Sequence, residues 1–208
     1  MEFRLYPKDV ETHGKRAGLI VSMKTTAVNR FNASTRLSQQ AKLTFWASTI
    51  FSLGLIFIPL MQLAGVKITL CDSLLSAMQV FLAVAILVYS IIISTARFEL
   101  RSAQLNDCGN SIKQLIRDLR IMPELDSGEE SKLLKDFQDR YAAMVANVEN
   151  HKRSDYILTI LRSRDLFALT SLGRALYWFK FIIASAPSYL IPIIIVLVEL
   201  VLIRGMFG

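Results

Sequence analysis

The sequence predicts an all-α membrane protein, in which a transmembrane helical hairpin is joined to a cytoplasmic helical hairpin and a third, C-terminal transmembrane helix. Two uncharged apolar stretches, Leu43 to Gly65 and Ser73 to Ala96, each exceed the roughly 20 residues that a helix needs to cross a bilayer. Only seven residues separate them, so the chain must return to the side that it left. A hydrophobic content of 53% and a mean hydropathy of +0.42 are ordinary for a small membrane protein.

The distribution of charge predicts the orientation of this hairpin. The segment before Leu43 carries eight Lys or Arg residues against three acids, whereas the connecting loop carries only Lys67 and Asp72. Basic residues near spans favour the cytoplasmic side, so we expect a multi-pass inner-membrane protein with a cytoplasmic N-terminus and an external loop. The net charge of +7 then indicates topology and contact with the anionic lipid bilayer. No basic face interleaved with aromatic residues points to direct nucleic-acid binding.

Residues 1–28 are expected to form a mobile basic N-terminal region, because Pro7, Gly14 and Gly18 interrupt any helical pattern. From about Asn29 a helix is expected to run into the first span, with Trp46 in the headgroup belt. This start defines a predicted domain over residues 29–156, with spans at about 43–65 and 73–96.

Two cytoplasmic helices are predicted after the second span, at about 97–121 and 129–150. The first is expected to continue the span without a break, with Gly109 either bending or weakening it. Pro123 ends it, and Ser127 to Glu130 has the form of a capping box that starts the next helix. Each helix carries an apolar stripe. These stripes are buried against each other, against other subunits of a homo-oligomer, or against both.

Residues 157–208 are interpreted as a C-terminal extension. Tyr156 to Arg174 alternates apolar runs with charges, which favours a helix lying on the membrane surface. Residues 181–203 are long enough to form a third crossing despite two prolines. This segment holds one acid, Glu199, which is either an acid at the outer membrane interface near Arg204 or part of a pore lining.

The densest polar run, Glu149 to Tyr156, is the main candidate for chemistry. Glu149, His151 and Asp155 include an acid–base pair, but their spacing leaves a metal short of ligands. A helix end held by side-chain hydrogen bonds is the alternative. The sequence shows no phosphate-binding loop, nucleophile elbow or metalloprotease motif. We therefore predict no enzyme, no catalytic residues, no metal and no cofactor.

These features together resemble the SLATT domain, a two-transmembrane effector module of bacterial conflict systems. The resemblance rests on Arg36 and Lys42 before the aromatic pair Phe45-Trp46, on the run from Arg97 to Arg101, on Tyr141, and on the motif of Glu149, Asn150, His151, Asp155 and Tyr156. The motif is similar to that of the subfamily often encoded beside reverse transcriptases.

The resemblance implies a pore-forming or membrane-disrupting antiviral effector that acts by abortive infection. A partner protein, from a reverse transcriptase or nucleotidyltransferase system, or a nucleotide signal is expected to trigger it. Arg97, Arg101, Lys152 and Arg153 are predicted to form an electropositive collar for lipid phosphates or that signal, or else to act as topology determinants. Two other functions remain open, a non-conducting anchor for a cytoplasmic partner and a small regulated channel without toxicity.

Overall fold

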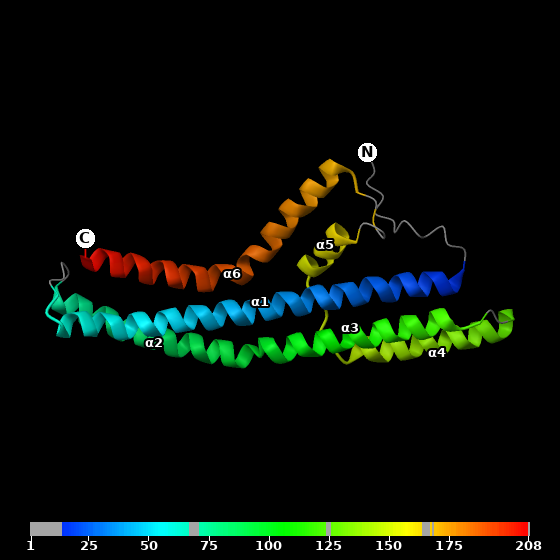
Figure 1. Cartoon of the computed structure of the whole chain (residues 1–208), viewed down its shortest axis with the longest axis horizontal. Coiled ribbons are helices and arrows are strands. Elements are labelled where there is room, and N and C mark those ends of the chain that lie inside the picture. Colours follow the sequence, from blue (N-terminus) through cyan, green and yellow to red (C-terminus); the bar gives the residue numbers. More distant parts are fainter. Residues whose placement is uncertain (1–13, 67–70, 124–125, 164–166, 168, 208) are drawn as a thin grey trace. The chain divides into compact units, whose positions relative to one another are not determined.

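The computed structural model describes residues 14–66, 71–123, 126–163, 167 and 169–207. Of these residues, 89% are helical and none forms a strand, which confirms the all-α class. The helices are α1 (Lys15–Leu63), α2 (Asp72–Ala96), α3 (Phe98–Ile121), α4 (Ser127–Ala146), α5 (Arg153–Arg162) and α6 (Ser171–Phe207) (Figure 1). They form two compact units, one of residues 1–37 and 99–185 and the other of residues 38–98 and 186–208.

Helix α1 starts much earlier than the sequence suggested. It begins at Lys15, so residues 15–28 are helical, and the expectation of a mobile segment is wrong for them. The reason is a stripe that the glycines obscured: Leu19, Met23 and Ala27 recur every four residues and are buried. Residues 1–13 lie outside the described part of the chain.

The first unit has a three-helix core instead of the expected two-helix hairpin. The apolar stripes of α3 and α4 pack on the first half of α1, and Phe137 and Ile112 are completely enclosed. Helix α3 runs antiparallel to α1, since Arg16 bonds the carbonyl of Leu119 near one end and Ser34 bonds Ser102 near the other. Burial within one chain therefore accounts for most of both stripes, while a homo-oligomer remains a prediction.

Helices α3 and α4 differ from expectation in three details. Arg97, with φ 45° and ψ 43°, separates α2 from α3, so the second span does not run unbroken into the next helix. Gly109 lies inside regular helix, and a Cβ there would come within 2.8 Å of the Phe31 ring, so the glycine permits close packing. Helix α4 starts at Ser127, within the expected capping-box segment, and ends at Ala146 instead of near residue 150; its N-cap is Asp126, without a side-chain cap bond.

Helix α5 is a buried element, so the expected surface helix over Tyr156 to Arg174 is incorrect for this part. Seven of its residues are buried: Ser154, Asp155, Ile157, Leu158, Thr159, Ile160 and Leu161. Ile160 packs with Phe167, Val21 and Tyr177. The charged residues Arg164 and Asp165 lie outside the described residues. Burial of one helix face explains the short apolar runs that suggested a membrane surface.

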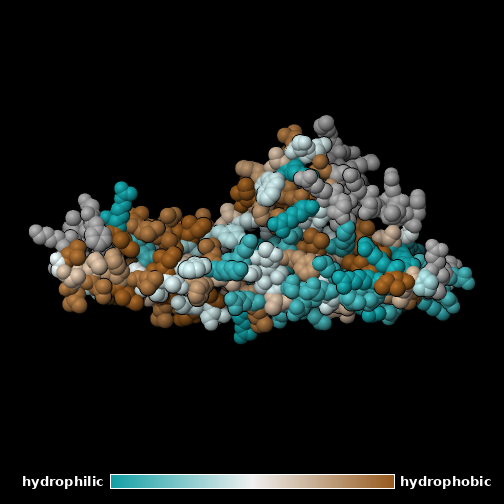
Figure 2. All heavy atoms as spheres, viewed as in Figure 1, coloured by the Kyte–Doolittle hydropathy of each residue, from teal (hydrophilic) through white to brown (hydrophobic). Residues whose placement is uncertain are grey.

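The second unit holds the apolar helices. By length and composition, α1 and the helical stretch Ser73–Ile121, which takes in α2 and α3, can each cross a membrane. Helix α6 provides a third span if the two sides of its bend at Pro187 and Pro192 count as one. Phe51 and Ile58 of α1 pack on Leu75 and Leu82 of α2. Figure 2 shows hydrophobic side chains gathered over these helices. Many stay exposed, including Phe81 at 71%, as expected for surfaces that face lipid or other subunits.

Candidate functional site

A cluster of buried and half-buried polar residues joins α1, α3 and α5 within the first unit. We call it the polar joint, and its members are Asn29, Arg30, Asn32 and Arg36 of α1, Arg101 and Ser102 of α3, Glu149 and His151 of the α4–α5 connection, and Asp155 and Thr159 of α5. Asn29, Asn32 and Arg36 recur at helical spacing and so share one face of α1. All three are less than 9% exposed. Polar groups are buried in this way only where they find partners.

An ion pair between Arg36 and Asp155 lies at the centre of the joint. Arg36 Nε donates to Asp155 Oδ1 over 2.8 Å and Nη2 donates to Oδ2 over 3.1 Å, a two-point contact. The side chains are only 8% and 2% exposed. Asp155 Oδ2 also accepts the backbone N–H of Lys152 over 2.8 Å. One carboxylate thus caps the start of α5 and ties that helix to α1.

Thr159 and two asparagines extend this contact by one helical turn. The Thr159 hydroxyl donates to Asn29 Oδ1 over 2.5 Å, and Asn32 Nδ2 donates to the Thr159 hydroxyl over 2.9 Å. Thr159 is completely buried. The hydroxyl is therefore used both as donor and as acceptor, which only a Ser or Thr side chain allows in this space.

Glu149 links the end of α4 to both neighbouring helices. Its backbone carbonyl accepts from the buried Arg30 guanidinium. Its carboxylate pairs with Arg101 of α3, with Oε2 lying 2.6 Å from Nη2 and 2.8 Å from Nε. Both side chains are about one-third exposed, so water weakens this pair relative to the buried one.

His151 completes the joint, with its Nε2 3.4 Å from Asn29 Nδ2. Burial lowers the pKa of His151 from its ordinary value, and the nearby Arg30 charge lowers it further, while Asp155 acts in the opposite direction. Among the described residues, nothing bonds its buried Nδ1. A neutral imidazole is the form that this environment favours.

The structure brings three of the five motif residues together. Glu149, His151 and Asp155 all face partners in the joint, whereas Asn150 is exposed and accepts the backbone N–H of His151 over 3.0 Å. Tyr156 is 37% exposed and packs edge-on to Phe167. No group of three or more His, Cys, Asp or Glu side chains in the described ranges is arranged to hold a metal ion. The arrangement is a polar connection in which side chains bond the backbone at the start of α5.

The four residues of the predicted basic collar are divided between the two units. Arg97 belongs to the second unit, while Arg101, Lys152 and Arg153 belong to the first. Arg101 is engaged by Glu149, and Lys152 and Arg153 are exposed. Its role in binding lipid or a signal stays a prediction.

Glu199 lies in the second unit and is only 1% exposed. Among the described residues, neither carboxylate oxygen has a hydrogen-bond partner. Its carboxyl group lies against Gly54 of α1, where a side-chain Cβ would overlap it. Glu199 is therefore a helix-contact residue whose place depends on a glycine.

Sequence reasoning missed Asn29, Arg30 and Thr159 as parts of the site. The available signal was a polar face at i and i+3 between the apolar positions Ala27 and Ala33, within a helix that becomes uncharged further on. Such a face indicates a buried polar contact. Its partner is more than a hundred residues away and could not be read from spacing.

The fold and this joint define a class of helical membrane protein in which one helix supplies both a candidate span and a buried polar contact. The model of the SMODS and SLOG-associating 2TM effector domain family 5, SLATT_5, matches residues 17–202, and the chain belongs to that family. The match takes in residues 157–202, so most of the expected C-terminal extension is part of the family's domain. No curated protein and no solved structure matches the chain.

Proposed function

We propose that this membrane effector oligomerises in the bacterial inner membrane, with its N-terminus cytoplasmic, and forms a pore or disrupts the bilayer when a partner or nucleotide signal announces viral infection. The family's description supports an effector role. The observation that carries the proposal is the continuity of α1 over 49 residues, from the polar joint into the apolar unit. A change at the joint therefore acts on the same helix that would cross the membrane.

The apolar helices favour assembly from several copies. In the most apolar part of the helical stretch Ser73–Ile121, only 11% is buried within the chain. Two or three such helices enclose no channel by themselves, so a pore requires a closed ring of subunits. Lipid covers the exposed faces of a single copy, and neighbouring copies replace it in the assembly.

The polar joint is the proposed control element. Arg36 and Asp155 hold α5 on α1, and a trigger shifts this arrangement only if it binds the released form more tightly. The trigger must offset the cost of separating the two charges, so the pair enforces one position of α5 in its absence.

Membrane potential after induced expression tests the proposal. Depolarisation is expected when the chain is expressed with its neighbouring genes and cells are challenged with phage. Ala85→Asp places a charge in the middle of α2. When this variant inserts into the membrane as the natural chain does, it should abolish depolarisation. Ala96→Asp, at the end of the same helix, is the matched control and should keep it.

Two other results would redirect the assignment. Intact potential under every condition contradicts pore formation and favours a non-conducting anchor for a cytoplasmic partner. Harmless currents whose ion selectivity changes in Glu199→Gln would favour the small regulated channel.

A further inference from the structure

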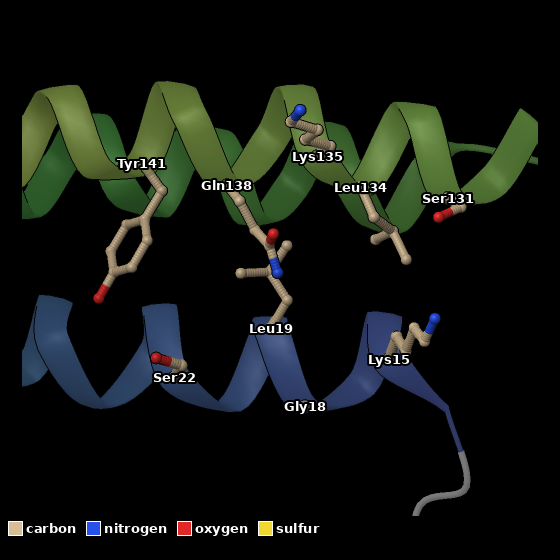
Figure 3. A pocket seen from close by; sticks show the side chains of 9 residues that line it. All are labelled: Lys15, Gly18, Leu19, Ser22, Ser131, Leu134, Lys135, Gln138 and Tyr141. Atoms are coloured by element: carbon tan, nitrogen blue, oxygen red, sulfur yellow. The ribbon is translucent and has the colours of Figure 1, made fainter.

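A cavity of about 740 Å³ opens between the first turns of α1 and the first half of α4, apart from every residue of the polar joint. Its lining is Lys15, Gly18, Leu19, Ser22, Ser131, Leu134, Lys135, Gln138 and Tyr141. Figure 3 shows Leu134, Gln138 and Tyr141 pointing from α4 towards α1. All nine residues belong to the first unit. The size lies within the range of small-molecule sites.

The chemistry of the lining favours an anion. It includes two lysines and, among the described residues that line it, no acid. Ser22, Ser131 and Gln138 are exposed polar side chains that can donate hydrogen bonds. Leu19 and Leu134 provide an apolar floor that also belongs to the three-helix core. Lysines bind phosphate as point charges, and hydroxyls complete its coordination.

The directions of α1 and α4 add to the positive charge that the two lysines bring to the cavity. Tyr141 bonds Thr26 over 2.6 Å and Ser131 lies across from Lys15, so α1 and α4 run parallel with both N-terminal ends at the cavity. Helix N-termini carry partial positive charge. The first turn of α1 holds no acid to offset it, whereas α4 has Glu129 and Glu130, neither of which lines the cavity.

We propose that this cavity binds the phosphate group of an anionic ligand through Lys15 and Lys135, with the apolar part of the ligand on Leu19 and Leu134. The ligand bridges α1 and α4 and so favours the packed form of the first unit. The biological role of this contact rests on the proposed function, but binding itself is measured without any membrane damage. Failure of the site is therefore distinguishable from failure of pore formation.

Calorimetric titration of ATP into the full chain in neutral-lipid nanodiscs is the direct test. Lys15→Gln and Lys135→Gln should each weaken binding about ten-fold, the size expected for one charged hydrogen bond. Lys132→Gln, which makes the same change of charge on α4 outside the cavity, should leave binding within about two-fold. Equal losses in all three variants would show non-specific attraction and overturn the proposal.

Gly18 offers a steric test at one position. A Cβ there meets nothing within 4 Å, so larger side chains extend into open space and the helix should fold. Gly18→Ala should retain ATP binding and Gly18→Phe should remove it, with unchanged melting temperatures. Binding that survives Gly18→Phe contradicts the proposal.

The phosphate group can belong to a nucleotide or to a lipid headgroup, and a second experiment separates these two sources. If ATP does not bind, native mass spectrometry of the chain from nanodiscs with phosphatidylglycerol should show bound lipid. The double variant Lys15→Gln with Lys135→Gln should lose this lipid, a result that supports a lipid headgroup as the ligand. Absence of both ATP and lipid binding overturns the proposal.

Discussion

Arg36 and Asp155 show what a single residue contributes to this protein. Taking a guanidinium and a carboxylate out of water is costly, and the two-point contact together with the Lys152 N–H offsets that cost. Neither partner is tolerable alone in this position. The pair therefore enforces one position of α5 on α1 more than it adds net stability.

Asp155→Asn should lower the free energy of unfolding by about 3–5 kcal/mol, because it leaves the Arg36 charge buried without a counter-charge. Arg36→Met combined with Asp155→Leu should recover much of that loss. Thermal denaturation in nanodiscs measures both. A double variant as unstable as the single one would show that loss of the ion pair itself, and not the unpaired Arg36 charge, causes the destabilisation.

His151 should make the first unit sensitive to acid. Its folded-state pKa is lowered, so the unfolded chain binds the proton more tightly, and stability is lost as pH falls through about 6.5 towards the folded pKa. Melting temperature is expected to fall between pH 7.5 and pH 5.5, and to fall less in His151→Gln. Identical pH profiles would contradict this, since His13 is present in both proteins.

At the scale of elements, glycines and one strained residue decide where helices meet and end. Gly109 admits the Phe31 ring, and Gly54 admits Glu199. Arg97 ends α2 in the left-handed conformation, which is unfavourable by about 1–2 kcal/mol for a residue with a Cβ. These positions cannot be understood from helix propensity alone.

Arg97→Gly should stabilise the chain by about 1 kcal/mol, because glycine adopts a positive φ without steric conflict. Arg97→Asn tolerates the same backbone conformation without the charge. Depolarisation that survives in both variants would remove Arg97 from the proposed collar. Loss of depolarisation in both variants, with normal amounts of the protein in the membrane, would assign a function to the Arg97 charge.

Gly54→Ala should destabilise the second unit by about 1–3 kcal/mol, because the new methyl group overlaps the Glu199 carboxyl. Shortening the acid in the double variant Gly54→Ala with Glu199→Ala should restore the melting temperature. Gly54→Ala with Glu199→Gln keeps the long side chain and serves as control. Full rescue by the glutamine would show that charge, and not space, controls this contact.

For the whole molecule, the orientation in the membrane follows from charge and is directly measurable. The two cysteines of the chain are well placed for this, since Cys71 is exposed at the start of α2 and Cys108 is buried in the first unit. The positive-inside rule predicts that Cys71 lies on the external side of the membrane. No other cysteine contributes background.

An impermeant maleimide added to intact bacteria should therefore label the protein, and Cys71→Ser should abolish the label. The Cys108→Ser variant should be labelled to the same extent as the natural chain. Labelling that appears only after the cells are opened would reverse the predicted topology and place the N-terminus outside.

The sequence by itself determined the membrane helices, the all-α class and the start of α4, because uncharged length, helical period and acidic first turns are local properties. It also indicated Glu149, His151 and Asp155, since a polar run after a periodic helix stands out. Only the tertiary structure decided that α1 begins at Lys15 and completes the three-helix core, and that Asn29, Arg30 and Thr159 belong to the joint. Their partners lie more than a hundred residues away, and burial of a polar group is set by what packs on it.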